Sequence, residues 1–167
     1  MSAGTSLYDE YITAYRHHSV TYGPNVAVLM MKGSFYNLLD IIDPKTGGCS
    51  TPIQKITEIL DIALKVKKGD APGGADAYFA GFPEDSLHKY AAMLTRENWT
   101  VVVIDQGERD AGRKRLTREV ARILSPGTHV EAMLNRSEPA YLAGLWLESA
   151  PWGDPSPPTF GGRVQRT

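Results

Sequence analysis

The sequence predicts an α/β fold, a mixed sheet with flanking helices. Apolar runs rich in branched residues alternate along the chain with amphipathic segments, and this alternation is typical of α/β domains. A short turn at residues 33–34 separates two apolar runs, so we expect a hairpin that supplies antiparallel edges to the sheet. With 167 residues, 42% of them hydrophobic and 22% charged, the chain is long enough to bury a core.

The first part of the chain predicts two helices and one hairpin. Ser6 can cap a helix over about residues 7–19, whose apolar residues share one face. The uninterrupted apolar run at 26–31 is typical of a buried strand, and residues 35–39 form its hairpin partner. Thr51 then caps a second helix, whose first residue is a proline.

The second part of the chain predicts further strands and one helix. In chain order we expect a turn at 69–74, a strand at 77–80, a helix from Pro83 to about residue 98, and strands at 100–104, 116–124 and 140–147. The apolar residues of 116–124 also fit helical spacing, so the pattern alone leaves that segment open. After residue 150 the density of Pro and Gly argues against a packed unit.

Residues 32–37, which read KGSFYN, are the most informative stretch of the chain. The glycine allows a tight turn, and two flat aromatic rings follow the serine. An aromatic ring at a hairpin tip can slide between stacked bases from the minor groove, where apolar wedges unstack and kink DNA. Taken alone, the same residues also fit a hairpin whose aromatic rings simply fill the core.

Three further sequence segments, which we call blocks, follow the predicted hairpin along the chain. Residues 79–83 read FAGFP, residues 101–106 read VVVIDQ, and residues 118–128 read REVARILSPGT. In this order the four blocks resemble the N-terminal mismatch-recognition domain of the MutS family of DNA mismatch repair. That family shows a G-D-F-Y-E hairpin, an A-G-x-P turn, a C-E-Q strand end and an R-E-V-x-R-x-x-T-P-G-T strand.

The resemblance covers about residues 7–131 and favours a strand at 116–124. It implies three segments: a DNA-binding domain at 1–131, the start of a connector-like domain at 132–149, and a Pro/Gly-rich tail at 150–167.

The resemblance also implies roles for the hairpin residues. Phe35 matches the phenylalanine that stacks on a mispaired base in the family, and Lys32 and Ser34 flank the turn where they could touch phosphates. Asn37 stands where the family has a glutamate that hydrogen-bonds the unpaired base, so this chain keeps hydrogen-bonding capacity but lacks the charge. Whether selectivity for mismatches survives this change is left open. Tyr36 points to the opposite face of its strand and is expected in the core.

Basic residues are concentrated in one stretch of an otherwise acidic chain. The net charge is −1, yet residues 109–122 hold six basic and two acidic side chains, a local charge of +4. Clustered Arg and Lys release counterions from a nucleic-acid backbone, which predicts an arm that contacts phosphates. The expected contacts are Arg113, Lys114, Arg115 and Arg118. The alternative is a charged loop that is merely solvated.

Two other classes of function remain open. One is a protein-interaction module that uses the first helix and binds no DNA. The other is a Mg²⁺-dependent nuclease, for which carboxylates near strand and helix ends would be needed, although their spacing follows no fixed pattern. The candidates are Asp40, Asp61, Asp105 and Glu108; of these, we interpret Asp105 as structural.

Three further features of the sequence limit the functions that we expect for the chain. It contains no G-x-x-x-x-G-K-[ST] phosphate loop, so we expect no enzyme activity and no cofactor. The resemblance implies that a longer parent protein would be an ATPase and could form a homo-oligomer. Cys49 is the only cysteine, which excludes an intramolecular disulfide. No apolar stretch reaches the length of a membrane span and no signal peptide is evident, so we expect an intracellular compartment. The resemblance implies double-stranded DNA as the partner.

Overall fold

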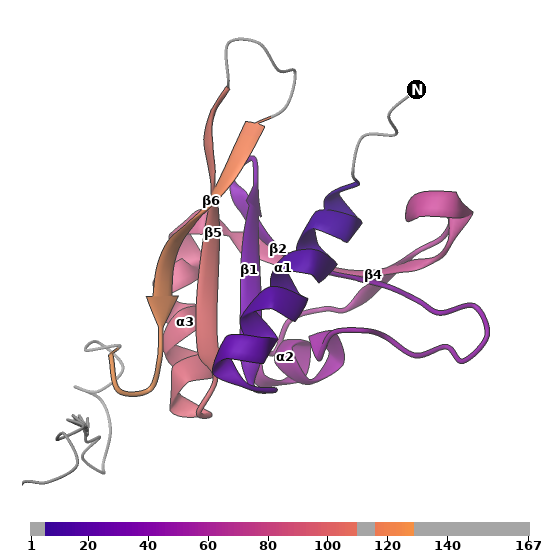
Figure 1. The fold of residues 1–167 in the computed structure, drawn as a ribbon. Coiled ribbons are helices and arrows are strands. Elements are labelled where there is room, and N and C mark those ends of the chain that lie inside the picture. Colours follow the sequence, from indigo (N-terminus) through magenta and orange to yellow (C-terminus); the bar gives the residue numbers. More distant parts are fainter. Residues whose placement is uncertain (1–5, 110–115, 129–167) are drawn as a thin grey trace, which may run out of the picture.

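The structure, a computed structural model, describes residues 6–109 and 116–128. Strands and helices alternate along this part of the chain, as Figure 1 shows. The strands are β1 (Val26–Lys32), β2 (Phe35–Ile41), β3 (Lys65–Lys67), β4 (Ala77–Pro83), β5 (Thr100–Arg109) and β6 (Leu116–Leu124). The α-helices are α1 (Leu7–Tyr22), α2 (Ile53–Leu60) and α3 (Leu87–Arg96), and short 3₁₀ turns lie at Pro72–Gly74 and Glu84–Ser86.

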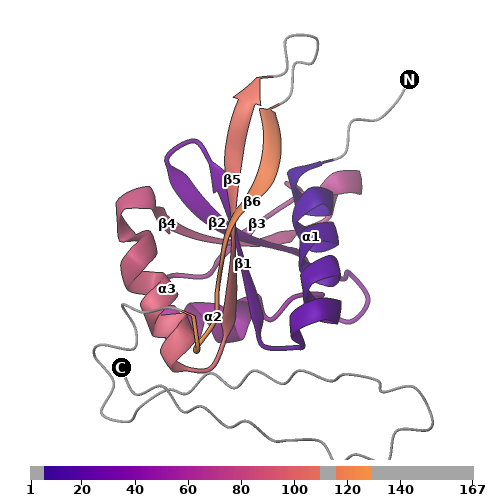
Figure 2. The same ribbon diagram turned by 60° about the vertical axis from the view of Figure 1, so that its left-hand side comes forward.

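All six strands form one mixed sheet in the order β3-β4-β2-β1-β5-β6. The pair β1–β5 is parallel and the other neighbours are antiparallel. Helix α1 covers one face of the sheet, while α2 and α3 cover the other (Figures 1 and 2). The predicted fold class, a mixed sheet with flanking helices, is therefore confirmed.

The hairpin formed by β1 and β2 lies in the middle of the sheet. The prediction that it supplies the edges was wrong, since β3 and β6 are the edge strands. The reason lies in the apolar run of β1, where Val26–Met30 are all buried. A strand that is apolar on both faces needs cover above and below and a neighbour on each side, and β5 and β2 provide the neighbours.

The predicted helix starts at Ser6 and Pro83 are found in the structure, while the predicted cap at Thr51 is not. Ser6 caps α1 as expected, because its Oγ accepts a hydrogen bond of 3.1 Å from the Asp9 N–H. Thr51 does not cap α2: its buried Oγ1 has no hydrogen-bond partner, and its N–H donates to Asp40 Oδ2 at 2.5 Å. Pro83 ends β4, where it pairs with Phe35, and it is also the N-cap of the 3₁₀ turn Glu84–Ser86 that leads directly into α3. The helical segment expected from Pro83 to about residue 98 therefore begins as a 3₁₀ turn, and α3 ends at Arg96.

The core fills both sides of the sheet. On the α1 side, the buried Tyr11 hydroxyl donates to the Val28 carbonyl at 2.9 Å. On the other side Tyr36, Phe82 and Tyr90 form a line of aromatic contacts between β2, β4 and α3. Among the described helices none is both long and apolar enough to span a membrane. The predicted strand at 140–147 and the tail lie outside the described residues.

Candidate nucleic-acid interface

The tip of the β1–β2 hairpin presents Phe35 to solvent. Gly33 adopts a φ of +63°, a conformation that favours glycine, and so allows the two-residue turn. Beyond the turn the side chains alternate: Phe35 is 48% exposed, whereas Tyr36 is 1% exposed. Lys32 and Ser34, which flank the turn, are also exposed. The structure therefore separates the two aromatic residues, one at the surface and the other in the core.

The turn is held by neighbouring strands rather than standing free. The Gly33 N–H donates to Gln106 Oε1 at 3.0 Å, and the Ser34 carbonyl accepts from the Glu84 N–H at 3.0 Å. Below the tip, the Tyr36 hydroxyl donates to Asp105 Oδ1 at 2.6 Å. Burial, together with this bond to a carboxylate, raises the pKa of Tyr36. Asp105 thus has the structural role that the sequence predicts.

Asn37 lies inside the sheet, with only 3% of its surface exposed. Its amide Nδ2 donates to the Phe35 carbonyl at 3.1 Å and to the Met30 carbonyl at 3.5 Å. Across the ladder it faces Gly81, where an added Cβ would lie 3.0 Å from Asn37 Oδ1 and 2.9 Å from the Tyr36 carbonyl. These backbone partners differ from the base contact that the resemblance implies for Asn37.

A basic strip lies on the same face of the sheet as Phe35. Paired residues of an antiparallel ladder point to one face, so the register places Lys32 beside Phe35, and Lys65 beside Phe79, on the α1 side. Lys67 follows on this face, with its Nζ 3.9 Å from the centre of the Phe79 ring. Sequence reasoning missed these two β3 lysines, although the run KVKK at 65–68 was a visible signal.

The basic strip has one acidic neighbour. Asp70 accepts a 2.6 Å hydrogen bond from the Tyr8 hydroxyl and lies 3.7 Å from Lys67 Nζ. The bond from Tyr8, with the charges of Lys67 and Lys32, lowers the pKa of Asp70. A hollow of about 230 Å³ opens between these groups and the start of α1. Its charged side chains, Lys32, Lys67 and Asp70, are exposed, so their charges face solvent.

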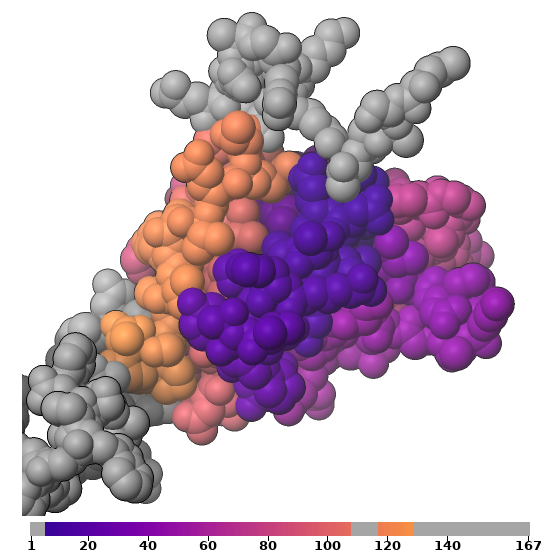
Figure 3. All heavy atoms as spheres, viewed as in Figure 1, coloured from indigo at the N-terminus to yellow at the C-terminus, as the bar shows by residue number. Residues whose placement is uncertain are grey.

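Arg118 connects β6 to the first helix. Its Nη1 lies 2.6 Å from Glu10 Oε2 of α1, and its Nε is buried without a hydrogen-bond partner. Figure 3 shows α1 and β6 side by side on this face of the molecule. This placement differs from the phosphate contact predicted for Arg118. The other predicted contacts, Arg113, Lys114 and Arg115, lie outside the described residues.

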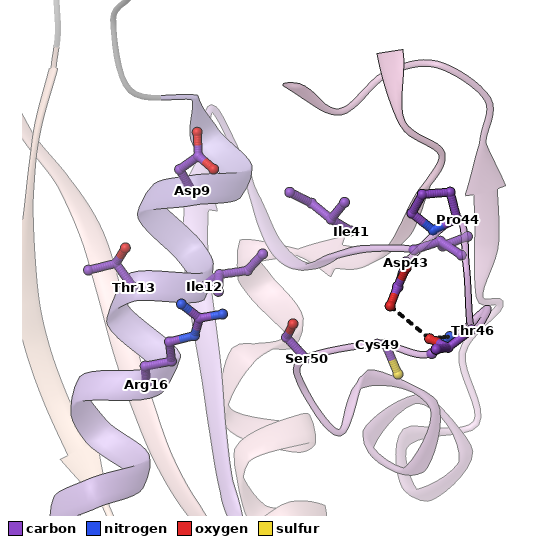
Figure 4. Close-up of a pocket in the computed structure, with 12 residues that line it drawn as sticks. Asp9, Ile12, Thr13, Arg16, Ile41, Asp43, Pro44, Thr46, Cys49 and Ser50 are labelled. Carbon is purple, nitrogen blue, oxygen red and sulfur yellow. Dashed lines mark hydrogen bonds between the residues drawn. The ribbon is translucent and has the colours of Figure 1, made fainter. Parts of the chain in front are cut away.

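A second hollow, of about 460 Å³, lies between α1 and the loop that follows β2 (Figure 4). Asp9 and Arg16 of α1 line one wall, and Asp43 and Cys49 lie on the loop side. The Asp43 carboxylate is engaged within the loop by the Lys45 N–H at 2.8 Å and the Thr46 hydroxyl at 2.9 Å. Since β2 begins at the hairpin tip and ends at this loop, the hollow is remote from Phe35.

The described residues include no group of three His, Cys, Asp or Glu side chains placed to hold a metal ion. Asp40, one of the carboxylates considered for a nuclease, is fully buried and accepts hydrogen bonds from the N–H groups of Ile41 and Thr51. Asp40 therefore closes the loop at residues 41–51, which is a structural role.

The fold and the exposed tip together define a small mixed-sheet α/β domain with a surface suited to binding. Comparison with known proteins then gives the family. Residues 54–133 match the family model for MutS domain I. A DNA mismatch repair protein MutS from Nostoc punctiforme is 33% identical over 102 residues, which are 59% of this chain and 11% of that protein. These matches support a MutS-family N-terminal domain in the chain.

The extent of the matches bears on the site. The family model describes domain I alone. Its match begins at residue 54, after the hairpin that carries Phe35, and covers the elements from α2 to β6. The aligned segment spans about a tenth of the length of the relative, namely 11%. The comparisons support the predicted resemblance at the level of the family, and the roles of individual hairpin residues stay predictions.

Proposed function

We propose that this domain binds duplex DNA from the minor groove and inserts the Phe35 ring at mispaired or easily deformed steps. The observation that carries this proposal is the 48% exposure of a large apolar ring at the tip of a braced hairpin. The exposed part of the ring is free to stack on a flat partner such as a base. Stacking on a base buries the ring and makes no demand on the base sequence.

Selectivity would come from the cost of opening the base stack. Inserting a wedge costs a few kcal/mol per step, and the cost is least where pairing is already damaged. A mispaired step therefore binds the same ring more tightly than an intact step. In this proposal Asn37 supports the strand beneath Phe35 through its bonds to the backbone, and the ring itself supplies the discrimination.

Affinity would come mainly from phosphate contacts around the wedge. Lys32, Lys65 and Lys67 lie on the face that carries Phe35, at a spacing set by the sheet register. Such contacts are indifferent to sequence and weaken as salt displaces them. The basic residues at 113–115 are proposed to add contacts from the loop between β5 and β6. In a longer parent protein, an ATPase would couple to this domain.

The test is a comparison of wild type and Phe35→Ala on two duplexes that differ only in one mispaired base. We expect Phe35→Ala to lose the preference for the mispaired duplex, keep weak salt-dependent binding, and unfold at nearly the wild-type urea concentration. Val20→Ala is the matched control, because Val20 is an exposed apolar residue on α1 remote from the tip.

Two results would contradict the proposal. If both duplexes bind Phe35→Ala as they bind the wild type, the ring is no wedge. If the variant loses about 3–5 kcal/mol of stability, as a buried Phe→Ala does, the ring belongs to the core.

A further inference from the structure

Two adjacent residues at the end of β5 hold the hairpin tip from opposite sides. Gln106 accepts the Gly33 N–H at 3.0 Å, and Asp105 accepts the Tyr36 hydroxyl at 2.6 Å. Successive side chains of a strand point to opposite faces, so the two bonds grip the hairpin above and below the sheet. In sequence, Phe35 lies between Gly33 and Tyr36, the two residues that these bonds hold.

The Gln106 bond is suited to orienting the tip rather than to stabilising the fold. It is exposed to solvent, so the Gly33 N–H can exchange its partner for water with little loss of stability. Gly33 is also the left-handed residue of the turn, with φ +63°. The peptide plane of a two-residue turn can swing unless an outside acceptor fixes it, and here the acceptor comes from β5.

We propose that Gln106 is a positioning residue that sets the mismatch selectivity of Phe35, an inference that rests on the proposed DNA-binding function. A wedge discriminates between duplexes only if its ring meets the base step in one pose, because binding groups lose effect when they are misplaced by about 1 Å. A tip that swings would still allow the lysines to contact phosphates. Loss of the Gln106 bond should therefore reduce selectivity more than affinity.

The test uses the full chain with two substitutions at one position. Gln106→Leu keeps the size of the side chain but removes the acceptor, whereas Gln106→Glu keeps an acceptor oxygen. Gln54→Leu on the exposed surface of α2 is the matched control for removing a glutamine amide. Two quantities are measured: hydrogen exchange of the Gly33 amide without DNA, and the ratio of affinities for mispaired and intact duplex.

We expect Gln106→Leu to speed Gly33 exchange by about tenfold, the worth of one ordinary hydrogen bond. The affinity ratio should fall several-fold toward one, while affinity for intact duplex changes little. Gln106→Glu should restore slow exchange and the affinity ratio, although its charge lowers the affinity for both duplexes. Gln54→Leu should leave both quantities unchanged.

The inference is overturned if Gly33 exchange is the same in Gln106→Leu and wild type, or if exchange is faster but the affinity ratio is unchanged. Failure of the proposed function gives a different result: the wild type itself binds the two duplexes equally, or Phe35→Ala retains the wild-type ratio. In that case the proposed role of Gln106 in selectivity is wrong as well. The exchange rate of the Gly33 amide still shows whether Gln106 holds the turn.

Discussion

At the scale of single residues, Gly81 shows how closely β4 approaches β2. A Cβ added at Gly81 would lie 2.9 Å from the Tyr36 carbonyl, a backbone atom that cannot turn aside. We expect Gly81→Ala to separate the two strands locally and to destabilise the domain by about 1–3 kcal/mol, as overpacking does. The measurement is the free energy of unfolding in urea.

The matched control for Gly81→Ala is Gly48→Ala in the exposed loop after β2. There the nearest atom to an added Cβ is the Thr46 hydroxyl oxygen at 3.2 Å, a side-chain atom of an exposed loop that needs to shift only slightly. Equal effects of the two substitutions would show that the approach of β4 to β2 imposes no constraint at Gly81.

Thr51 is a second position where a single atom affects the stability of the domain. Its Oγ1 is buried without a hydrogen-bond partner, and a buried hydroxyl of this kind costs about 1–3 kcal/mol. Thr51→Val keeps the shape of the side chain and the backbone bond to Asp40 but removes the hydroxyl. We expect the variant to unfold at a higher temperature than the wild type. A lower midpoint would mean that the hydroxyl has a partner in solution.

At the scale of elements, the basic residues at 113–115 fall in sequence between β5 and β6. Each basic residue that neutralises a phosphate adds about 0.9 units to the slope of log affinity against log salt. We expect replacement of all three residues by Ala to reduce this slope by roughly two to three units. The measurement is a titration of intact duplex at several salt concentrations.

The control replaces three lysines outside the proposed face, Lys45, Lys55 and Lys89, which changes the net charge by the same amount. A slope that falls equally in both variants would indicate a general effect of charge. A slope that changes in neither would favour the alternative interpretation of 113–115 as a solvated loop.

The sequence predicted the order of elements well and their boundaries less well. The hairpin, the branched run of β5 and the strand at 116–124 all followed from residue pattern or family resemblance. The end of β4 did not: the strand was expected to stop at residue 80, whereas its pairing with β2 continues to Pro83, opposite Phe35.

The candidate site was predicted only in part, for a similar reason. The exposure of Phe35 and the burial of Tyr36 follow from strand alternation, but the partners of Asn37 and Arg118 lie on other elements. Arg118 pairs with Glu10, which is 108 residues away in sequence, and no local pattern reports such a pairing. The lysines of β3 join the Phe35 face for the same long-range reason.

At the scale of the whole molecule, stability should depend on pH through His18 of α1. Burial, and then the neighbouring His17, lowers the pKa of His18 below its value in the unfolded chain. Protonation therefore favours unfolding, so this contribution is fully present above about pH 6.5 and is lost as pH falls below that value.

We expect the free energy of unfolding to decrease between about pH 7.5 and 5.5, and His18→Gln to flatten this decrease. His88→Gln in α3 is the control for removing a histidine as such. The prediction is wrong if the pH dependence of unfolding is the same in His18→Gln and in the wild type.

The central place of the β1–β2 hairpin also bears on the order of folding. The hairpin closes through neighbouring residues and can form within microseconds, whereas the bonds from Gln106 and Asp105 join residues 73 and 69 positions apart. Those bonds exist only after the parallel pair β1–β5 has formed, which is the slow step in chains of this topology. A nascent chain that has not yet reached β5 would therefore expose Phe35 on a loose turn, able to touch DNA or another apolar surface but unable to select among them. If Phe35 acts as the proposed wedge, discrimination begins only when β5 has been synthesised and has paired with β1.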